Sequence, residues 1–189
     1  MSIQRLLFTG MPGSGKSTQA YTSCFPQLDK ERLLKGVFLP APLKKEYPYE
    51  ETLFLDLIEK SVKQISPYLV DYGYILDGLA TDLKIARFIV TKGLANTVIN
   101  FTIPEEEAIR RLSKELEDDQ PIKPLSEEYK KRFEEYHKRT APAINYLKKY
   151  SASDSNLKYF DINASKPQKE IHIEIIQILR LLGDKSLHI

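Results

Sequence analysis

The sequence predicts an α/β protein in which helices cover both faces of a parallel sheet, as a three-layer α/β/α sandwich. Short apolar runs alternate along the chain with amphipathic segments of helical period, and this alternation is typical of parallel sheets. The 189 residues can enclose one hydrophobic core, so we expect a single domain over residues 1–189. The hydrophobic fraction of 42% and the charged fraction of 29% exclude a disordered or fibrous chain.

Charge and cysteine content exclude several classes of protein. The chain has 28 Lys and Arg residues against 26 Asp and Glu residues, a net charge of +2, so we expect no nucleic-acid partner. The lone Cys24 cannot form an internal disulfide, and a cytoplasmic location is the simplest setting for it. No segment reaches the roughly 18 apolar residues of a membrane span, and no apolar leader opens the chain. We therefore expect no membrane contact.

The first half of the chain is predicted to contain a strand and two helices. Residues 3–8 form an apolar strand, and a glycine-rich stretch leads to a helix that begins at Lys16. Prolines within residues 24–47 exclude a long helix there, so we expect loops around one helical turn at 30–35. Apolar residues three and four apart then predict a helix over 48–65.

The second half is predicted to contain three strands, each followed by a helix, and one further long helix. Ser126 is expected to cap the long helix, which Pro142 should kink or restart. Ser165 and Gln168 have the spacing of a capping box for the last helix, and Gly183 ends it. The strands and the helices after them are expected at residues 72–76 and 81–91, 97–103 and 104–116, and 158–162 and 166–182.

A glycine-rich motif lies between the first strand and the first helix. Residues 10–17 match G-x-x-x-x-G-K-[ST] in full, the pattern of a phosphate-binding loop, or P-loop. Its glycines let backbone N–H groups turn toward a phosphate, and the helix N-terminus adds its dipole. The alternative, a glycine-rich turn with a chance lysine, is expected in about one chain of this size in a hundred. We predict that ATP is bound by Gly10, Gly13, Ser14, Gly15, Lys16, Ser17 and Thr18.

Two side chains are candidates for holding Mg²⁺. In a P-loop the lysine, here Lys16, reaches the β- and γ-phosphates, and the hydroxyl, here of Ser17, binds the metal. Asp77 ends a predicted strand, where an acid beside the loop can hold a metal-bound water. Its alternative role is that of a turn residue, because Asp-Gly is a common turn dipeptide.

We interpret the three isolated histidines as surface or packing residues: His137, His172 and His188.

Several segments resemble the adenylate kinase and nucleoside monophosphate kinase family, in the family's order. The resemblance covers most of the chain and implies a P-loop NTPase fold. It implies that Arg111 stacks on the ATP adenine, that Arg132 contacts the transferring phosphoryl group, and that the turn with Lys166 lies against the adenine. The matching segments are the loop at 10–20, Tyr-Ile-Leu-Asp-Gly at 74–78, Ile-Pro-Glu at 103–105 with Arg111, residues 132–142, and Asp161 with Lys166-Pro167.

Both of these arginines also have a simpler interpretation. Each could belong to a solvated helix face, with Arg111 paired to Glu107 and Arg132 paired to Glu128, four residues earlier in each case. Such a pair stabilises a helix by only about 0.2–0.5 kcal/mol.

The sequence departs from the family where the family binds its acceptor, a nucleoside monophosphate. The family follows Asp-Gly with an arginine that grips the monophosphate and, four residues on, with a glutamine that binds its base. Here Thr81 and Ile85 occupy these positions. The monophosphate-binding region, residues 24–66, is also reduced. The cations that could stand in are Arg32, Lys35, Lys84 and Arg87.

Residues 117–125 are expected to form a short lid over ATP. The family's additional lid arginines fall at Glu115 and Leu116, whereas the lid acids Asp118 and Asp119 are retained.

The sequence therefore predicts a monomeric, ATP- and Mg²⁺-dependent phosphotransferase of the nucleoside monophosphate kinase type. Lys16, Arg132 and Asp77 would carry catalysis. One alternative is a P-loop kinase of another small-molecule acceptor, for which Asp77 or Asp82 could serve as the base. A second alternative is a nucleotide-binding module with little turnover. A GTP switch is less favoured, because the sequence has no guanine-reading Asn-Lys-x-Asp motif.

Overall fold

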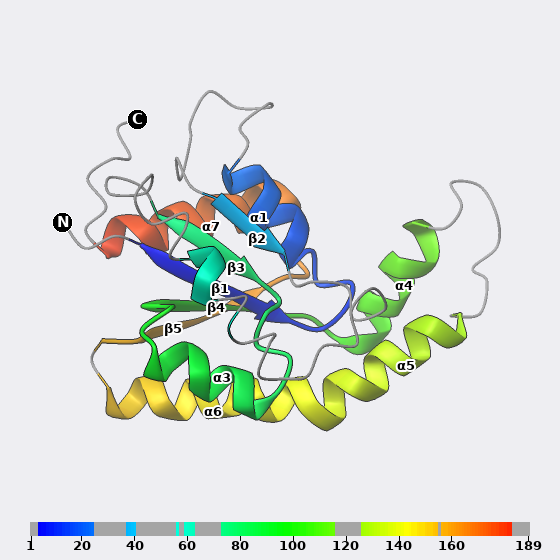
Figure 1. The fold of residues 1–189 in the computed structure, drawn as a ribbon. Coiled ribbons are helices and arrows are strands. Elements are labelled where there is room, and N and C mark those ends of the chain that lie inside the picture. The colour runs from blue at the N-terminus through cyan, green and yellow to red at the C-terminus, as the bar shows by residue number, and fades with distance from the viewer. Residues whose placement is uncertain are drawn as a thin grey trace.

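The molecule is built as three layers around one parallel sheet (Figure 1). The structure, a computed structural model, describes residues 4–24, 37–40, 56, 59–62, 73–115, 126–154 and 156–182. The strands are β1 (Arg5–Gly10), β2 (Val37–Pro40), β3 (Tyr74–Asp77), β4 (Thr97–Thr102) and β5 (Lys158–Asn163). The helices are α1 (Lys16–Cys24), α3 (Leu83–Thr91), α4 (Glu105–Glu115), α5 (Glu127–Glu135), the π-helix η2 (Tyr136–Thr140), α6 (Ala141–Ser153) and α7 (Gln168–Leu181).

The five strands are parallel and have the order β2-β3-β1-β4-β5. In the central strand β1, Leu7 lies opposite Leu76 of β3 and Val98 of β4. The chain fills one side of β1 with β2 and β3 before it crosses to β4. Ligands of open α/β sheets bind at such a switch point, at the carboxyl ends of the strands. The predicted fold class is confirmed, and the phosphate loop follows the strand at this point.

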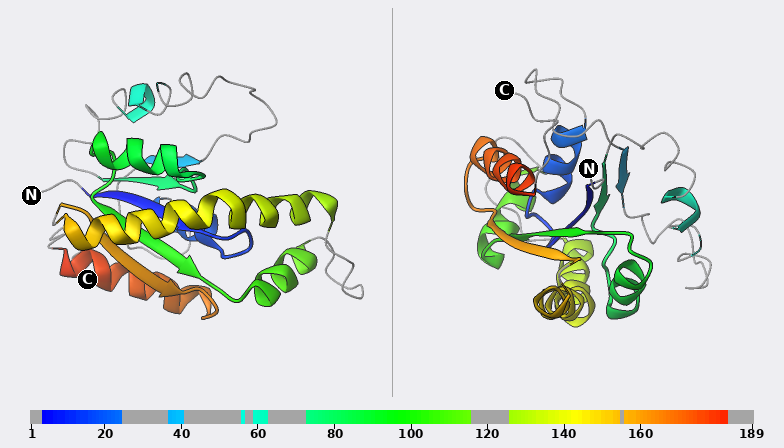
Figure 2. Two further views of the ribbon diagram at one scale, coloured as in Figure 1. Left: turned by 90° about the horizontal axis from the view of Figure 1, so that it is seen from below. Right: turned by 90° about the vertical axis from the view of Figure 1, so that its left-hand side faces the viewer.

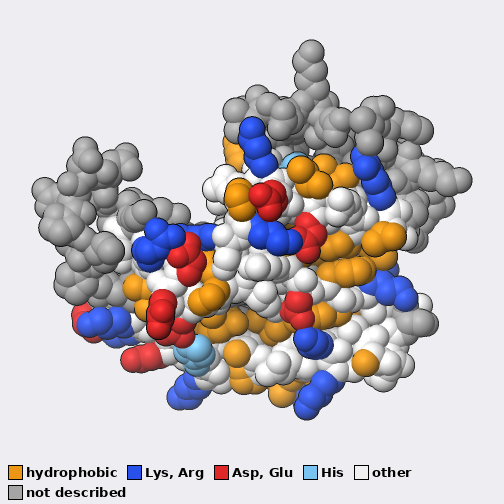
Figure 3. Space-filling view, turned by 180° about the vertical axis from the view of Figure 1, so that it is seen from behind, with side chains coloured by type: hydrophobic (Ala, Val, Ile, Leu, Met, Phe, Trp, Pro, Cys, Tyr) orange, Lys and Arg blue, Asp and Glu red, His pale blue; other side chains and the backbone are white. Residues whose placement is uncertain are grey.

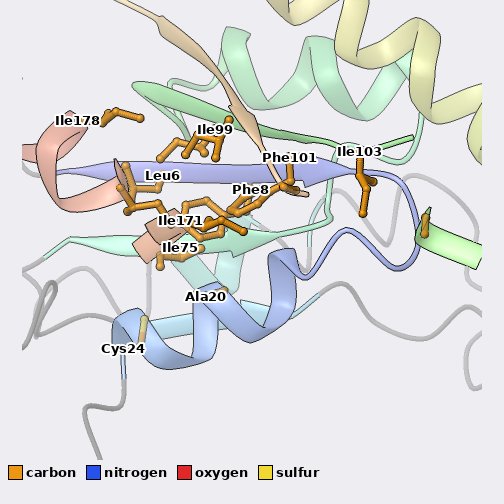
Figure 4. Close-up of a cluster of buried hydrophobic side chains, with 14 of the residues drawn as sticks. Leu6, Phe8, Ala20, Cys24, Ile75, Ile99, Phe101, Ile103, Ile171 and Ile178 are labelled. Carbon is orange, nitrogen blue, oxygen red and sulfur yellow. The ribbon is translucent and has the colours of Figure 1, made fainter. Parts of the chain in front are cut away.

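Buried apolar side chains form one cluster on each face of the sheet. Phe8 and Ile99 belong to the cluster between the sheet and the helices α1 and α7 (Figure 4). Leu7 and Leu147 belong to the cluster between the sheet and the helices α3 and α6. Figure 2 shows these two helical layers on opposite sides of the sheet. Leu7 and Phe8 are neighbours on β1 but enter different clusters, because successive side chains of a strand point to opposite faces. Burial of both faces explains the nearly continuous apolar runs of the strands.

The helices α5, η2 and α6 follow one another along the lower side of the molecule in Figure 1. The predicted cap is confirmed, because the N–H of Tyr129 donates to Oγ of Ser126 over 3.4 Å. The predicted restart is also confirmed, because η2 precedes α6, which has Pro142 in its first turn. Proline has no N–H to donate to the carbonyl four residues earlier, and the wider π turn accommodates this loss.

Two local predictions are wrong. The prediction of loops and one helical turn within residues 24–47 is wrong at Val37–Pro40, which forms the edge strand β2 beside β3. This strand is short and ends in proline, which sheets tolerate at an edge. The capping box at Ser165 does not form either, since Pro167 is the N-cap of α7 and makes no side-chain capping bond. The N–H of Ser165 instead donates to Oδ1 of Asn163 in a local turn.

Some predictions fall on residues outside the described part: the helical turn at 30–35, most of the helix at 48–65, the lid at 117–125, and Gly183. Within the helix predicted at 48–65, residues 56 and 59–62 are described and are helical. Among the described residues, no helix is long and apolar enough to cross a membrane. The face opposite to that of Figure 1 has acidic and basic side chains interspersed on its described residues (Figure 3), which accords with the small net charge.

Candidate active site

The phosphate loop turns on three glycines with positive φ. The φ angles of Gly10, Gly13 and Gly15 are 144°, 78° and 77°, a region in which other residues are strained. A Cβ on Gly10 would lie 2.6 Å from the carbonyl oxygen of Phe101, and one on Gly13 would lie 2.6 Å from that of Ala108. A Cβ on Gly15 would meet nothing within 4 Å. The first two glycines thus let the loop pack on β4 and α4, while Gly15 leaves space for a phosphate group to approach the backbone.

Two other polar residues of the motif differ in exposure. Ser14 is buried, and its Oγ has no hydrogen-bond partner in the described part of the chain. Thr18 is exposed on α1, and its carbonyl oxygen accepts from Oγ1 of Thr22. Ser14 therefore has an unused buried hydroxyl inside the loop.

Lys16 is the first residue of α1, and its Nζ lies 3.4 Å from the carbonyl oxygen of Met11. Burial lowers the pKa of Lys16, the carboxylate of Asp77 raises it in part, and the nearby guanidinium of Arg132 lowers it further. The electrostatic effect of Arg132 on Lys16 means that two cations from distant segments lie near one another at the loop. Their repulsion favours an anion at this place.

Ser17 and Asp77 are joined by a short hydrogen bond. Oγ of Ser17 donates to Oδ2 of Asp77 over 2.6 Å, which links α1 to the end of β3. Asp77 is buried, and burial raises the pKa of its carboxyl, opposed by the bond from Ser17 and by the charge of Lys16. Its Oδ1 is buried without a hydrogen-bond partner in the described residues. A hydroxyl beside a carboxylate with a spare oxygen is a donor set that fits Mg²⁺ and its water.

The two arginines assigned to the nucleotide have different surroundings. The guanidinium of Arg132, which is exposed on α5, lies over the ring of Tyr129 at 5.4 Å from its centre. Arg111 of α4 donates from Nε to Oε1 of Glu107 over 3.0 Å. The structure thus places Arg132 near Lys16 and places Arg111 in the ion pair of its alternative role.

The turn after β5, which contains Lys166, is tied to the phosphate-loop helix. Nε2 of Gln19 on α1 donates to the carbonyl oxygen of Gln168 over 2.9 Å. Nζ of Lys166 forms an ion pair with Glu174 of α7 at 2.8 Å, and this bond raises the pKa of the lysine. The turn is therefore held on the α1 side of the sheet.

The residues assigned to the acceptor are described only in part. Arg32 and Lys35 lie outside the described residues. Lys84 and Arg87 are exposed on α3, and the guanidinium of Arg87 lies over the ring of Tyr146 at 5.6 Å from its centre. Arg87 therefore packs on α6, in the helical layer below the sheet.

A polar cluster outside the predicted site joins η2 to the start of α3. Nη2 of Arg139 donates to Oδ2 of Asp82 over 2.7 Å, and Oγ1 of Thr140 donates to the carbonyl oxygen of Thr81 over 3.1 Å. Oδ1 of Asp82 accepts from the N–H of Ile85 over 2.9 Å and so caps α3. The cap has a sequence signal, an acid just before an amphipathic helix. The pairing with Arg139 has none, because it joins residues 57 positions apart.

Comparisons with known proteins bear on this geometry. No protein-family model matches the chain. An adenylate kinase from Photorhabdus laumondii is 25% identical over 216 residues, which cover 93% of this chain and 99% of that protein. An adenylate kinase from Coxiella burnetii is 25% identical over 218 residues, which cover 92% of this chain and 93% of that protein. A crystal structure of a sugar kinase from Janibacter sp. has a TM-score of 0.59 at 13% identity and covers 95% of both chains.

These similarities extend over nearly the whole length of the chain. The sugar kinase, at 13% identity, bears on the fold alone. The chain has a P-loop kinase-like fold.

Proposed function

We propose that the chain is an ATP-dependent phosphotransferase that transfers the γ-phosphoryl group to a small molecule of the nucleoside monophosphate type. The observation that carries the proposal is the bond of Ser17 to Asp77 beside Lys16 of the phosphate loop, and the electrostatic influence of Arg132 on Lys16 supports it. Adenylate kinases at 25% identity support nucleotide-dependent, kinase-like phosphoryl transfer. This reaction depends on positioning and charge neutralisation, which these groups can supply.

Each residue has a distinct part in the proposal. The backbone N–H groups around Gly15 hold a phosphate, where the loop has open space. Lys16 and Arg132 balance the charge of the transferring group, which removes the repulsion between them. Ser17 and, through a water, Asp77 would hold Mg²⁺, and Oδ1 of Asp77 is spare for that water. When bound, Mg²⁺ supplies further neutralisation of phosphate charge.

A monophosphate acceptor should bind more weakly than ATP. Oγ1 of Thr81 is buried without a hydrogen-bond partner in the described residues, so it can bond a polar atom but brings no charge. A charge-assisted contact contributes about 1.5–3 kcal/mol. An arginine can make two such contacts to one phosphate, and their loss at Thr81 without replacement weakens binding by roughly a hundredfold or more.

A second candidate is transfer to a hydroxyl group of another small molecule, which requires a base. Both carboxylate oxygens of Asp82 are engaged, one by the N–H of Ile85 and the other by Arg139. Asp77 retains a spare oxygen, and burial raises the pKa of its carboxyl, as a base requires. These observations favour Asp77 over Asp82 as the base for such an acceptor.

Calorimetric titration with ATP and Mg²⁺, and separately with AMP, tests the proposal together with a coupled transfer assay. We expect ATP to bind at least about a hundredfold more tightly than AMP and Lys16→Ala to abolish transfer. Transfer to a hydroxylated acceptor, but to no monophosphate, would select the second candidate. ATP binding without any transfer would indicate a binding module, and the absence of ATP binding would contradict the phosphate-loop assignment.

A further inference from the structure

The π-helix η2 connects α5, which carries Arg132, to α6. Its defining bond runs from the N–H of Ala141 to the carbonyl oxygen of Tyr136, five residues earlier. Such turns are rare, and they often occur at functional sites. Pro142 disfavours an ordinary α-helical turn here, because its ring clashes with the carbonyl four residues earlier, that of Lys138.

Side chains of η2 bind the starts of two other helices. Arg139 and Thr140 bind Asp82 and Thr81, just before α3. On the other side, Nε2 of His137 lies 2.6 Å from Oε2 of Glu105, the first residue of α4. The helices α3 and α4 follow β3 and β4, the two strands beside β1. The π-helix is thus bonded to the starts of the two helices that follow the neighbours of β1, the strand that leads into the phosphate loop.

The number of residues in the turn of η2 determines the rotation of α5 about its own axis. A π turn contains one residue more than an α turn, and one residue corresponds to about 100° of helix rotation. Ala143 and Leu147 anchor α6 in the cluster below the sheet. If η2 narrowed to an α turn while α6 stayed in place, α5 would rotate by about this angle. Arg132 would then turn away from Lys16.

We propose that Arg139 is a positioning residue that acts through Arg132. Its ion pair with Asp82 adds to the effect of Pro142 in holding η2 as a π turn, and so keeps Arg132 on the side of α5 from which its charge acts on Lys16. The catalytic part of the inference rests on the proposed function, whereas the orientation of α5 can be measured without any substrate.

Two variants break the ion pair with little other change. Asp82→Asn removes the charge but keeps a good helix cap, because Asn caps helices as well as Asp does. Arg139→Met keeps most of the length of the side chain without its charge. The matched control is Lys130→Gln, which removes another ion pair of similar length, the 2.7 Å pair of Lys130 with Glu127 on α5.

The first measurement is the distance between spin labels on α5 and α7 in the nucleotide-free protein. Glu134→Cys and Gln177→Cys place the labels at exposed positions, and the native Cys24 is buried. We expect one narrow distance distribution in the protein with the native pair and in Lys130→Gln. We expect a shifted or broadened distribution in Asp82→Asn and in Arg139→Met. Unchanged distributions in both would overturn the inference, whatever the protein catalyses.

The second measurement is the kinetics of phosphoryl transfer. Arg139→Met and Asp82→Asn should lower kcat by about tenfold to a hundredfold, the scale of a misplaced catalytic group, while the ATP dissociation constant changes less than about twofold. Adding Arg139→Met to Arg132→Ala should cause no further loss, because one residue acts through the other. Arg139→Lys should restore part of kcat. Full activity of Arg139→Met, or additive losses with Arg132→Ala, would overturn the inference. If the native protein transfers no phosphate, the proposed function fails and the label distances alone decide.

Discussion

Replacing Lys16 by Met should stabilise the nucleotide-free protein while it removes nucleotide binding. Burial is the largest influence on Lys16 and disfavours its charge, the nearby Arg132 adds to this effect, and only Asp77 opposes it. Since the net effect of these surroundings, the attraction of Asp77 included, disfavours the charge of Lys16, a neutral side chain of similar volume removes an unfavourable contribution to the free energy of folding. We therefore expect a gain on the order of 1 kcal/mol, a typical size for the effect of a single substitution. In a protein of this size, this gain raises Tm by roughly 2–4 °C.

Thermal unfolding followed by circular dichroism measures both effects. Without nucleotide at pH 7, Lys16→Met should unfold above the native protein, and Lys16→Arg, which keeps the charge, should not. With ATP and Mg²⁺ at about a hundred times the dissociation constant, the native protein should gain about 2.7 kcal/mol. The Met variant should gain nothing, because it has lost the cation that binds the phosphates.

The pH dependence of the free energy of unfolding independently tests whether the charge of Lys16 destabilises the folded protein. The pKa of Lys16 in the folded protein lies below the ordinary value of 10.5, so the unfolded chain binds the proton more tightly. The native protein therefore gains stability as the pH rises from the folded pKa toward 10.5, and the advantage of Lys16→Met narrows over this interval. A Met variant less stable than the native protein at pH 7, or an advantage that widens with pH, would refute this account.

Three further predictions concern the phosphate loop and its metal site. Gly13→Ala should lower the free energy of unfolding in denaturant more than Gly15→Ala does, because only its Cβ lies 2.6 Å from the carbonyl oxygen of Ala108; Gly15→Ala should mainly weaken ATP binding in calorimetry, and the reverse ranking would contradict the packing argument. Asp77→Asn should reduce Mg²⁺-dependent transfer more than metal-free nucleotide binding, since the amide keeps the shape without the charge; equal losses would indicate a turn residue. Ser17→Ala should lower the free energy of unfolding by about 1.5–3 kcal/mol, the contribution of a hydrogen bond to a charged group; an unchanged unfolding midpoint in denaturant would show that the bond to Asp77 contributes little.

Local sequence determined the phosphate loop and most of the elements around it. The conformation of the loop depends on glycines that tolerate positive φ and on a helix that begins at Lys16, and both are properties of neighbouring residues. The strands β1 and β4 were predictable as apolar runs, because both faces of a parallel sheet are buried. The restart of the helix at Pro142 was predictable from the lost N–H of that proline. Where two local signals competed, as at Ser165, the shorter-range turn prevailed.

Tertiary structure alone decided which distant side chains meet. The bond from Ser17 to Asp77 spans 60 positions and that from Arg139 to Asp82 spans 57. The first bond depends on how parallel strands bring their carboxyl ends to one edge of the sheet, and the second on how η2 packs against the start of α3. No local pattern encodes either arrangement. The same holds for Arg111, whose side chain the structure places against Glu107. Composition and spacing therefore predicted the chemistry of the phosphate loop, whereas the tertiary structure determined the partners of its side chains.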